Sequence, residues 1–582
     1  MKSIKSIAFS LGATAFLLSS CSGFLDKLPD ERTEINTEDK VIKLLTTAYP
    51  TCNYSYVCEL SSDNMIDNWA PHLPSSPNSK QIESHYNYSV SYLYEDEIFR
   101  FEPASHATYS DWDSPGTLWE GYYSGIATVN HALKAIDEIV ARDGGMSEKL
   151  RAARAEAYLI RAYNHFLLVN IFSQAYKDEE QSKKDVGVPY VTEVEDQMTK
   201  QYERGNVADT YAKIQSDLEA GLADIRNINY EKPKWHFNVN AAHAFAARFY
   251  LYTRQWEKVI EHANAVLGTD SVSTARMMMD YSAFKDCVSV GDYSLVWQNP
   301  SLNNNLMLCT TYSILSRMIF GHRYSVAGIP AREALMVHSS PLWSGYIVPA
   351  ISIVGMQLLS SSASDYGYIS AKIYEQFEYS DKIAGIGYPH QIVRAFTSNE
   401  LLLERAEAEI MLGRYDEAAR DLMYYWNNAI NSFTPEDKQA YVTTGYIKYL
   451  TKDILLDNWK PANAGQTNHP NVFANWDFTA TNVSPSYVIP AEAVVYMNCL
   501  NDFRRYENAF EGLRFFDLKR WGVEYTHTVG LEKTPYTLRG IDERRAIEVP
   551  WEAMSAGMES SRPTLPANPT KPSLNMDELR IK

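Results

Sequence analysis

Apolar residues recur every three or four positions over several long stretches of the chain, which is the spacing along one face of an amphipathic helix. Leu118, Tyr122 and Ile126 begin one such stripe within residues 118–141. The same spacing predicts further helices over residues 147–172, 207–225, 241–253, 256–267, 398–412, 415–429 and 496–513. Alternating patterns typical of strands are short and scattered. The sequence therefore predicts a mainly helical protein.

Two pairs of predicted helices share a local pattern. In each pair, small residues precede a short turn, and an aromatic residue, Trp256 or Tyr415, opens the second helix. This arrangement of two antiparallel helices is typical of tetratricopeptide repeats, in which small residues let the helices approach and the aromatic fills the space between hairpins. We therefore expect a tetratricopeptide-like helical repeat scaffold, with residues 151–176 forming half of a further unit.

Two long segments lack this periodicity. Residues 52–112 and 280–390 are rich in Ser, Asn, Gly, Pro and Tyr, and we expect large, irregular, loop-rich excursions there. Long irregular segments inside a folded protein usually carry function. Repeat helices are expected at about 118–267 and 398–522, and the length of the chain by itself would allow two to four domains.

The first residues have the pattern of an export signal. Lys2 and Lys5 precede an apolar run at 7–18, which is long enough for a signal-peptide core and too short to span a bilayer. Leu18-Ser19-Ser20-Cys21 has the order of a lipobox, so we expect residues 1–20 to be removed and Cys21 to be lipidated. A lipid on Cys21 is then the membrane attachment that the sequence offers.

The charge and the cysteines of the chain argue against two kinds of function, nucleic acid binding and zinc binding. The chain carries 54 basic and 72 acidic side chains, a net charge of −18, which repels phosphate backbones and argues against a nucleic acid partner. Beyond Cys21, Cys52 and Cys58 lie close enough in sequence to form a disulfide, and two buried thiols are the alternative. No pair of cysteines has the spacing of a zinc site, so we expect no metal.

The aromatic composition suggests a binding surface. The chain has 40 Tyr and 12 Trp against 21 Phe, and Tyr and Trp combine a packing face with a polar group. Surfaces that bind sugars or peptides are rich in Tyr and Trp. Helical-repeat proteins also use these large, amphipathic side chains at positions between the helices. The two excursions carry many of these residues: Trp69, Tyr86, Tyr88, Tyr92, Tyr94, Trp112, Trp297, Tyr312, Tyr324, Trp343 and Tyr346. We select Trp69, Trp297, Tyr324 and Trp343 as ligand platforms, with a core position as the alternative for each.

Motifs of catalysis are missing from the sequence. It contains no GxSxG, HExxH, GxxxxGK[ST] or CxxC pattern. Asp63, Asp67 and the acidic run at 95–97 are interpreted as solvated surface acids, in preference to a glycosidase pair or a calcium site. We predict no catalytic residue and no cofactor, and therefore a binding protein.

Several motifs, in chain order, resemble the SusD/RagB family. They are FLDKLP at 24–29, EAYLIRAY at 156–163, GVP at 187–189, the helix at 394–409 with its AEA, and EGLRFFDLKRWG at 511–522. The last is similar to the family signature EGxRWFDLxRWG, with Phe515 in place of the usual Trp and Leu513 in place of the usual His or Lys. Its charges and aromatics at helical spacing predict a packed, structural helix whose charges satisfy one another.

The resemblance implies one domain over residues 21–582. In it, about four tetratricopeptide-like helix pairs form a scaffold, and the irregular excursions pack against it and build the ligand site. The resemblance also implies a non-enzymatic lipoprotein of the outer membrane, facing the cell exterior and anchored through Cys21. Its partner would be a SusC-like TonB-dependent transporter, to which it delivers oligosaccharides. A peptide-binding RagB-like protein of the same fold is the alternative. A surface glycoside hydrolase and a purely structural adaptor are ranked below both.

Overall fold

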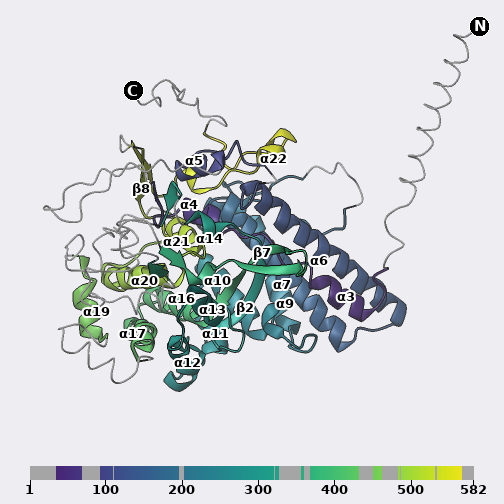
Figure 1. The fold of residues 1–582 in the computed structure, drawn as a ribbon, viewed down its shortest axis with the longest axis horizontal. Helices are drawn as coiled ribbons and strands as arrows, with labels where there is room; N and C mark the ends of the chain where they lie inside the picture. Colours follow the sequence, from purple (N-terminus) through teal and green to yellow (C-terminus); the bar gives the residue numbers. More distant parts are fainter. Residues whose placement is uncertain are drawn as a thin grey trace, which may run out of the picture.

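The computed structural model shows a mainly helical protein, as the periodicity predicts (Figure 1). Helices α6 and α7 form a long pair at one end of the molecule, and α17, α19 and α20 lie at the other (Figure 1). The structure describes residues 34–67, 92–108, 111–195, 202–319, 322–326, 356–358, 368–431, 450–461, 483–484, 487–530 and 534–565. The predicted signal peptide and Cys21 therefore lie outside the described residues.

The first helical hairpin consists of α6 (Pro115–Asp143) and α7 (Glu148–Phe172). Helix α6 ends at Gly144 with φ 72°, a left-handed conformation that glycine adopts without a Cβ penalty. Helix α7 begins at Glu148, after a short turn. The Ser147 side chain caps its N-terminus by accepting a hydrogen bond from the Leu150 N–H. Helix α9 (Val207–Asp224) packs on α7, and α3 (Glu38–Leu45) packs on α6 and α7.

Two further hairpins turn in the same way. They are α10 (Val239–Tyr252) with α11 (Trp256–Leu267), and α16 (Ser398–Met411) with α17 (Tyr415–Asn431). In the first turn the Gln255 N–H donates to the Tyr250 carbonyl, and in the second the Arg414 N–H donates to the Glu409 carbonyl. Both are the six-to-one bond of a Schellman motif. Helix α11 also packs on α16, so the hairpins stack and the predicted helical-repeat scaffold is confirmed.

One predicted helix ends earlier than expected. The helix predicted at 496–513 is α20 (Val494–Glu507), and a break separates it from α21 (Leu513–Trp521). Phe510 and Gly512 adopt φ values of 68° and 78°, which end one helix before the next begins. A Cβ at Gly512 would lie 2.9 Å from the Ser55 Cα, so glycine is required there. Periodicity misses the break because Phe510 is buried within it.

The excursions contain more regular structure than the sequence predicts. Three strands, β2 (Asn305–Thr311), β7 (Ile386–Thr397) and β6 (Gln376–Asp381), form an antiparallel sheet in that order. Strand β2 is buried at every position except Thr310, so its sequence shows no alternation of apolar and polar residues. Helices α4 (Ser55–Leu60) and α5 (Leu93–Phe99) lie in the first excursion.

The remaining α-helices and strands are short. The helices are α8 (Glu179–Ser182), α12 (Ser271–Met277), α13 (Val290–Trp297), α14 (Leu315–Met318), α19 (Lys452–Asn458) and α22 (Trp551–Ser555). The strands are β1 (Ile66–Asp67), β3 (Tyr324–Ser325), β4 (Met356–Leu358), β5 (Tyr368–Ser370), β8 (Tyr525–Val529) and β9 (Thr534–Leu538). Of the helices in the described part of the chain, none combines the length and apolar character that crossing a membrane requires.

Candidate ligand-binding site

Two of the four selected aromatic residues lie inside the protein. Trp297 ends α13 and is fully buried, with the Arg394 guanidinium 4.6 Å and the Lys372 ammonium 5.0 Å from its ring. Tyr324 is 1% exposed, and its ring stacks on Phe99 at 4.2 Å. Protein atoms therefore enclose both rings, and their contact with a ligand stays a prediction. Trp69 and Trp343 lie outside the described residues.

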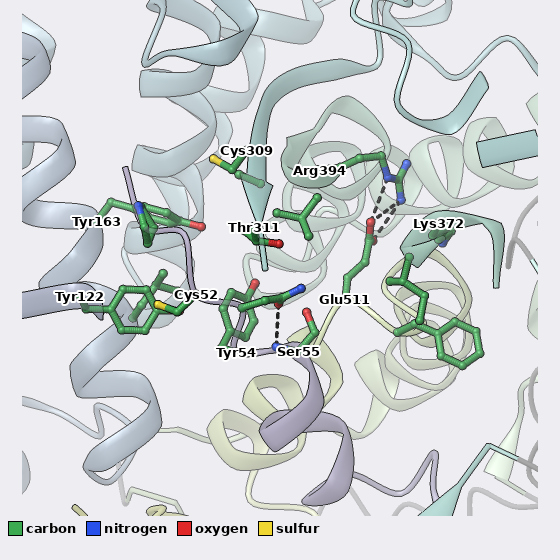
Figure 2. A pocket seen from close by; sticks show the side chains of 17 residues that line it. Cys52, Tyr54, Ser55, Tyr122, Tyr163, Cys309, Thr311, Lys372, Arg394 and Glu511 are labelled. Carbon is green, nitrogen blue, oxygen red and sulfur yellow. Dashed lines mark hydrogen bonds and ion pairs between the residues drawn. The ribbon is translucent and has the colours of Figure 1, made fainter. Parts of the chain in front are cut away.

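An enclosed cavity lies close to Trp297, among residues of β2, β7 and the segment before α21 (Figure 2). Arg394 donates two hydrogen bonds to Glu511, at 2.9 and 3.0 Å, and Lys372 Nζ donates to the Glu507 carbonyl. Burial lowers the pKa of Lys372 to about 8. The cavity holds about 30 Å³, roughly the volume of one water molecule. It is an internal void with a mostly apolar lining and is too small for an organic ligand.

An open cleft of about 610 Å³ lies beside the first turns of α6. Its volume falls in the range of roughly 300–1,000 Å³ that small-molecule sites occupy. Trp112, Tyr312 and Tyr388 line it and are 40%, 43% and 61% exposed. The remaining lining residues are Thr51, Cys52, Asp111, Asp113, Thr117, Glu120, Gly121 and Ser124. Accessible aromatic faces and polar groups thus surround one space large enough for a ligand.

Trp112 is presented by a loop that hydrogen bonds hold in shape. The Trp112 carbonyl accepts a bond from the Tyr94 hydroxyl of α5 at 2.6 Å. The neighbouring Asp111 carboxylate accepts from the Thr108 N–H at 2.8 Å, and its carbonyl accepts from the Thr117 hydroxyl at 2.5 Å. These bonds hold the backbone of Asp111 and Trp112 in place, which lowers the cost of ordering this part of the loop when a ligand binds.

The two tyrosines come from the central sheet. Tyr312 follows β2, and its N–H donates to the Thr51 carbonyl at 2.7 Å. Tyr388 lies in β7, directly opposite Glu378 of the edge strand β6. Because β2 and β7 pair antiparallel, the sheet fixes the position of Tyr388 in β7 relative to Tyr312, the residue directly after β2.

The buried carboxylate of Asp113 ties the tryptophan loop to the tyrosine loop. Its Oδ2 accepts bonds from the Ser313 hydroxyl at 2.9 Å and the Ile314 N–H at 2.7 Å. Asp113 follows Trp112 in the chain, and Ser313 follows Tyr312. Burial raises the pKa of Asp113 to about 7, although the two hydrogen bonds lower it. Asp113 therefore positions two of the three exposed rings that line the cleft.

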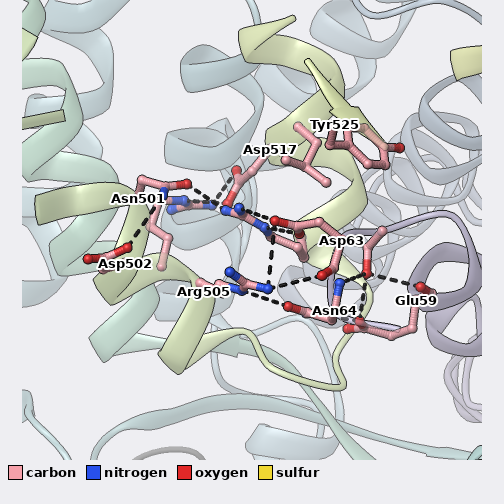
Figure 3. Close-up of polar contacts among 12 residues, drawn as sticks. Glu59, Asp63, Asn64, Asn501, Asp502, Arg505, Asp517 and Tyr525 are labelled. Carbon is pink, nitrogen blue, oxygen red and sulfur yellow. Dashed lines mark hydrogen bonds and ion pairs between the residues drawn. The ribbon is translucent and has the colours of Figure 1, made fainter. Parts of the chain in front are cut away.

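The most recognisable motif, at 511–522, has a different role. Arg514 donates to Asp63 at 2.7 and 2.8 Å, and Asp517 accepts from Arg504 at 2.8 Å and from Arg520 at 2.9 Å (Figure 3). All of these side chains except Asp63, which is partly buried, belong to the buried part of the structure. The predicted structural role is confirmed, but the pairing within the helix is limited to Asp517 and Arg520. The other partners come from α20, from the segment after α4, and from α16, whose Glu407 accepts from Arg520 at 2.6 Å.

The acids interpreted as solvated surface are largely buried, so that prediction is wrong. The Asp67 carboxylate accepts from Arg323 at 3.1 Å, and the Glu97 carboxylate lies 2.6 Å from the His106 ring. Their partners come from other segments of the chain, which a local pattern cannot show. Within the described ranges, no group of three His, Cys, Asp or Glu side chains is placed to hold a metal ion. Cys52 and Cys58 are buried and unpaired, which was the second alternative.

Sequence reasoning placed Trp112 and Tyr312 in the excursions but did not select them, and it did not consider Tyr388. One signal could have identified Trp112. It stands between two aspartates and is followed by Ser114-Pro115, the start of α6, so it had to lie in a surface loop at a helix N-terminus. No comparable signal marks the tyrosines, because their exposure depends on the pairing of β2 with β7.

Residues 23–251 match the SusD-like family whose description is starch-binding associating with outer membrane. The comparison with curated proteins gave no match. SusD superfamily crystal structures are similar along most of the chain. One from Bacteroides vulgatus has 16% identity and a TM-score of 0.55, and covers 91% of this chain and 98% of its own. One from Bacteroides thetaiotaomicron has 16% identity, TM-score 0.51 and coverages of 90% and 98%. One from Bacteroides fragilis has 15% identity and a TM-score of 0.52, and covers 90% of this chain and 99% of its own.

The motifs at 24–29, 156–163 and 187–189 fall inside the matched residues, and the others fall where the fold alone is shared. At these identities the structural likeness bears on the fold and leaves the ligand open. Over residues 23–251 the chain is similar in sequence to the SusD-like family, and over about nine tenths of its length it shares the fold of SusD superfamily structures.

Proposed function

We propose that the protein binds oligosaccharides at the cleft between Trp112, Tyr312 and Tyr388 and holds them without turnover. The observation that carries the proposal is the set of three exposed aromatic rings around one open cleft. The apolar face of a sugar ring stacks on such surfaces, and sugar hydroxyls donate to carboxylates such as Asp111 and Glu120. The description of the matching family as starch-binding supports the same class of ligand.

The carboxylates of the cleft suit binding better than hydrolysis. A glycosidase needs two carboxyl groups that both reach the scissile bond. Asp113 has a raised pKa, as a general acid would, but it is 2% exposed and its Oδ2 is engaged by the Ile314 N–H. A peptide ligand is the second candidate, because the acidic lining would favour a basic peptide.

We further propose that the mature chain, residues 21–582, is one domain anchored through Cys21 to the outer membrane and facing the cell exterior. There it would deliver its ligand to a SusC-like TonB-dependent transporter. The family's description as associating with the outer membrane supports this location. Trp69 and Trp343 remain proposed as additional platforms, together with Trp297 and Tyr324 if a ligand reaches their enclosed rings.

Binding of the full mature chain to a glycan array and a peptide panel, followed by calorimetry, tests the proposal. We expect glycans to bind, no product to form, and Trp112→Ala or Tyr312→Ala to lower affinity at least about tenfold. Trp551→Ala is the matched control, because Trp551 is 44% exposed and lines neither open cleft. Binding of peptides alone, or unchanged affinity in both cleft variants, would refute the proposal.

Two cellular measurements test the location and the partner. Cys21→Ala should release the protein from the outer membrane, because the lipid chain is lost. Affinity purification of the wild-type chain from membranes should recover a TonB-dependent transporter. Retention of the Cys21→Ala variant in the membrane would contradict the anchor, and recovery of the wild type without a transporter would contradict the partnership.

A further inference from the structure

A second cleft, of about 390 Å³, adjoins the first along α6. Thr117 and Gly121 line only the first cleft, and Tyr123 and Ala127 line only the second. At 100° per residue, these two sets lie on neighbouring faces of the helix. Glu120 and Ser124 line both clefts and lie on the boundary between the faces. The two spaces therefore meet across a ridge formed by Glu120 and Ser124.

The second cleft repeats the chemistry of the first. Its aromatic residues are Trp119, Tyr123 and Tyr202, and its acids are Glu193 and Glu195, in addition to the shared Glu120. The Trp119 and Tyr123 rings lie 4.9 Å apart. The Tyr123 hydroxyl donates to the Pro189 carbonyl at 2.9 Å, which fixes the position of its ring. Trp119 is 8% exposed and the two tyrosines are partly exposed, so Tyr123 and Tyr202 supply most of the accessible aromatic surface on this side of the ridge.

The charge of the lining has one sign. Five acidic residues line the two clefts: Asp111, Glu120, Glu193 and Glu195, which are at least partly exposed, and Asp113, which is buried. Among the described residues that line them there is no Lys, Arg or His. A uronate or sulfate group would meet like charges here and find no cation to pair with. Neutral sugars meet no such penalty, because their hydroxyls donate to carboxylates.

We propose that the two clefts form one groove over the Glu120–Ser124 ridge, which selects long, uncharged glycan chains and rejects anionic ones. This inference rests on the proposed glycan binding and adds the length and charge class of the ligand. A chain that fills both clefts makes two sets of contacts for one loss of translational freedom, so its affinity should rise steeply with length. A short fragment would fill the first cleft alone.

A substitution at Ala127 separates the two clefts. Ala127 is exposed and lines only the second cleft, so Ala127→Trp would fill that space without disturbing the core. His131→Trp is the matched control, because His131 is exposed one helical turn further along α6 and lines neither cleft. Circular dichroism and melting temperature establish that both variants fold.

The probes are trimers and heptamers from starch, β-1,3-glucan, mannan and xylan, with oligogalacturonate and oligoalginate of the same lengths as anionic counterparts. For the neutral series that binds, we expect the wild-type affinity for the heptamer to exceed that for the trimer about tenfold or more. Ala127→Trp should remove this gain and leave trimer binding unchanged, and His131→Trp should retain it. Anionic oligomers should bind at least about tenfold more weakly.

The outcomes separate this inference from the function on which it rests. If neutral oligomers bind but the heptamer binds no more tightly than the trimer, the proposal of one continuous groove is wrong. It is also wrong if the higher affinity for the heptamer persists in Ala127→Trp. In both cases the proposed glycan binding is still supported. Equal or tighter binding of the anionic oligomers overturns the charge selection. If no oligosaccharide in either series binds, the proposed function fails and the inference fails with it.

Discussion

Acidic, basic and aromatic side chains gather in two regions of the molecule: the cluster around α21, and the cleft beside the first turns of α6. Around α21, Arg514 meets Asp63, and Asp517 meets Arg504 and Arg520, so the charges are neutralised inside the protein. In the cleft, carboxylates line an open space that contains no described basic side chain. The same residue types hold the chain together in one region and remain available to a ligand in the other.

The comparison shows that the most recognisable motif forms a buried structural cluster that is separate from the open cleft. The cluster around α21 joins segments that are about 450 residues apart in sequence, as the Arg514–Asp63 bond does. Removing one partner from a buried ion pair leaves a charge without compensation. Such residues can change little, whereas the residues of an open cleft can vary with the ligand. The experiments below test this division.

The largest effect is expected at Arg514. Arg514→Ala removes two hydrogen bonds from Asp63 and leaves that carboxylate without them in the interior. We expect the free energy of unfolding to fall by about 3–5 kcal/mol in urea denaturation. The control is Arg539→Ala, at a 75% exposed side chain paired with Glu524, where a change below about 1 kcal/mol is expected. Equal losses in the two variants would contradict a structural role specific to the cluster.

A comparable effect is expected at Trp297. Trp297→Ala empties a fully buried position beside Arg394 and Lys372 and should cost about 3 kcal/mol. Trp112→Ala, at a 40% exposed ring, should cost less than about 1 kcal/mol while weakening ligand binding. Thermal denaturation and calorimetry on both variants give the two readouts. Loss of affinity in a stable Trp297→Ala variant would instead place Trp297 in the binding site.

The cluster around α21 should lose stability in acid. Burial alone would raise the pKa of Asp63, but the charges of Arg505 and Arg514 outweigh it and hold the pKa well below its usual range. The stabilisation is therefore present above the unfolded pKa of about 3.9 and is lost as the pH falls below it. We expect about 2 kcal/mol to be lost between pH 5 and pH 2 in urea denaturation, and less in Asp63→Asn. A wild-type stability that does not change across this range would contradict the assignment.

The smallest effect is expected at Asp113. Its contribution to stability decreases as the pH rises, whereas that of Asp63 decreases as the pH falls. The pKa of Asp113 is raised to about 7, above its unfolded value, so its contribution is present below about pH 4 and is lost as the pH rises towards 7. Asp113→Asn should make the melting temperature nearly constant between pH 5 and pH 7 and should keep the ligand affinity.

Asp113→Ala should lower the ligand affinity by roughly threefold to tenfold, because the hydrogen bonds between the Trp112 and Tyr312 loops are lost. An Asn variant as weak as the Ala variant would mean that the charge itself binds the ligand.

Part of the fold could be predicted from local pattern. The helix over 256–267 begins and ends as predicted, and Ser147 caps the helix that it was expected to start. The sheet could not be predicted, because β2 is buried on both faces and shows no alternation. The cleft was missed for a related reason: Trp297 and Tyr312 both lie in the second excursion, and only packing decides that one is buried and the other exposed.

The sequence by itself determined the helical repeats, the resemblance to a family, and a composition that favours binding over catalysis. These depend on spacing along the chain, which is local. Only the tertiary structure decided which acids are paired, which aromatics are exposed, and that Trp112, Tyr312 and Tyr388 line one cleft. Burial and pairing are properties of contacts between distant segments. A residue such as Asp113, whose hydrogen-bond partners lie about 200 positions away, shows its role only after folding.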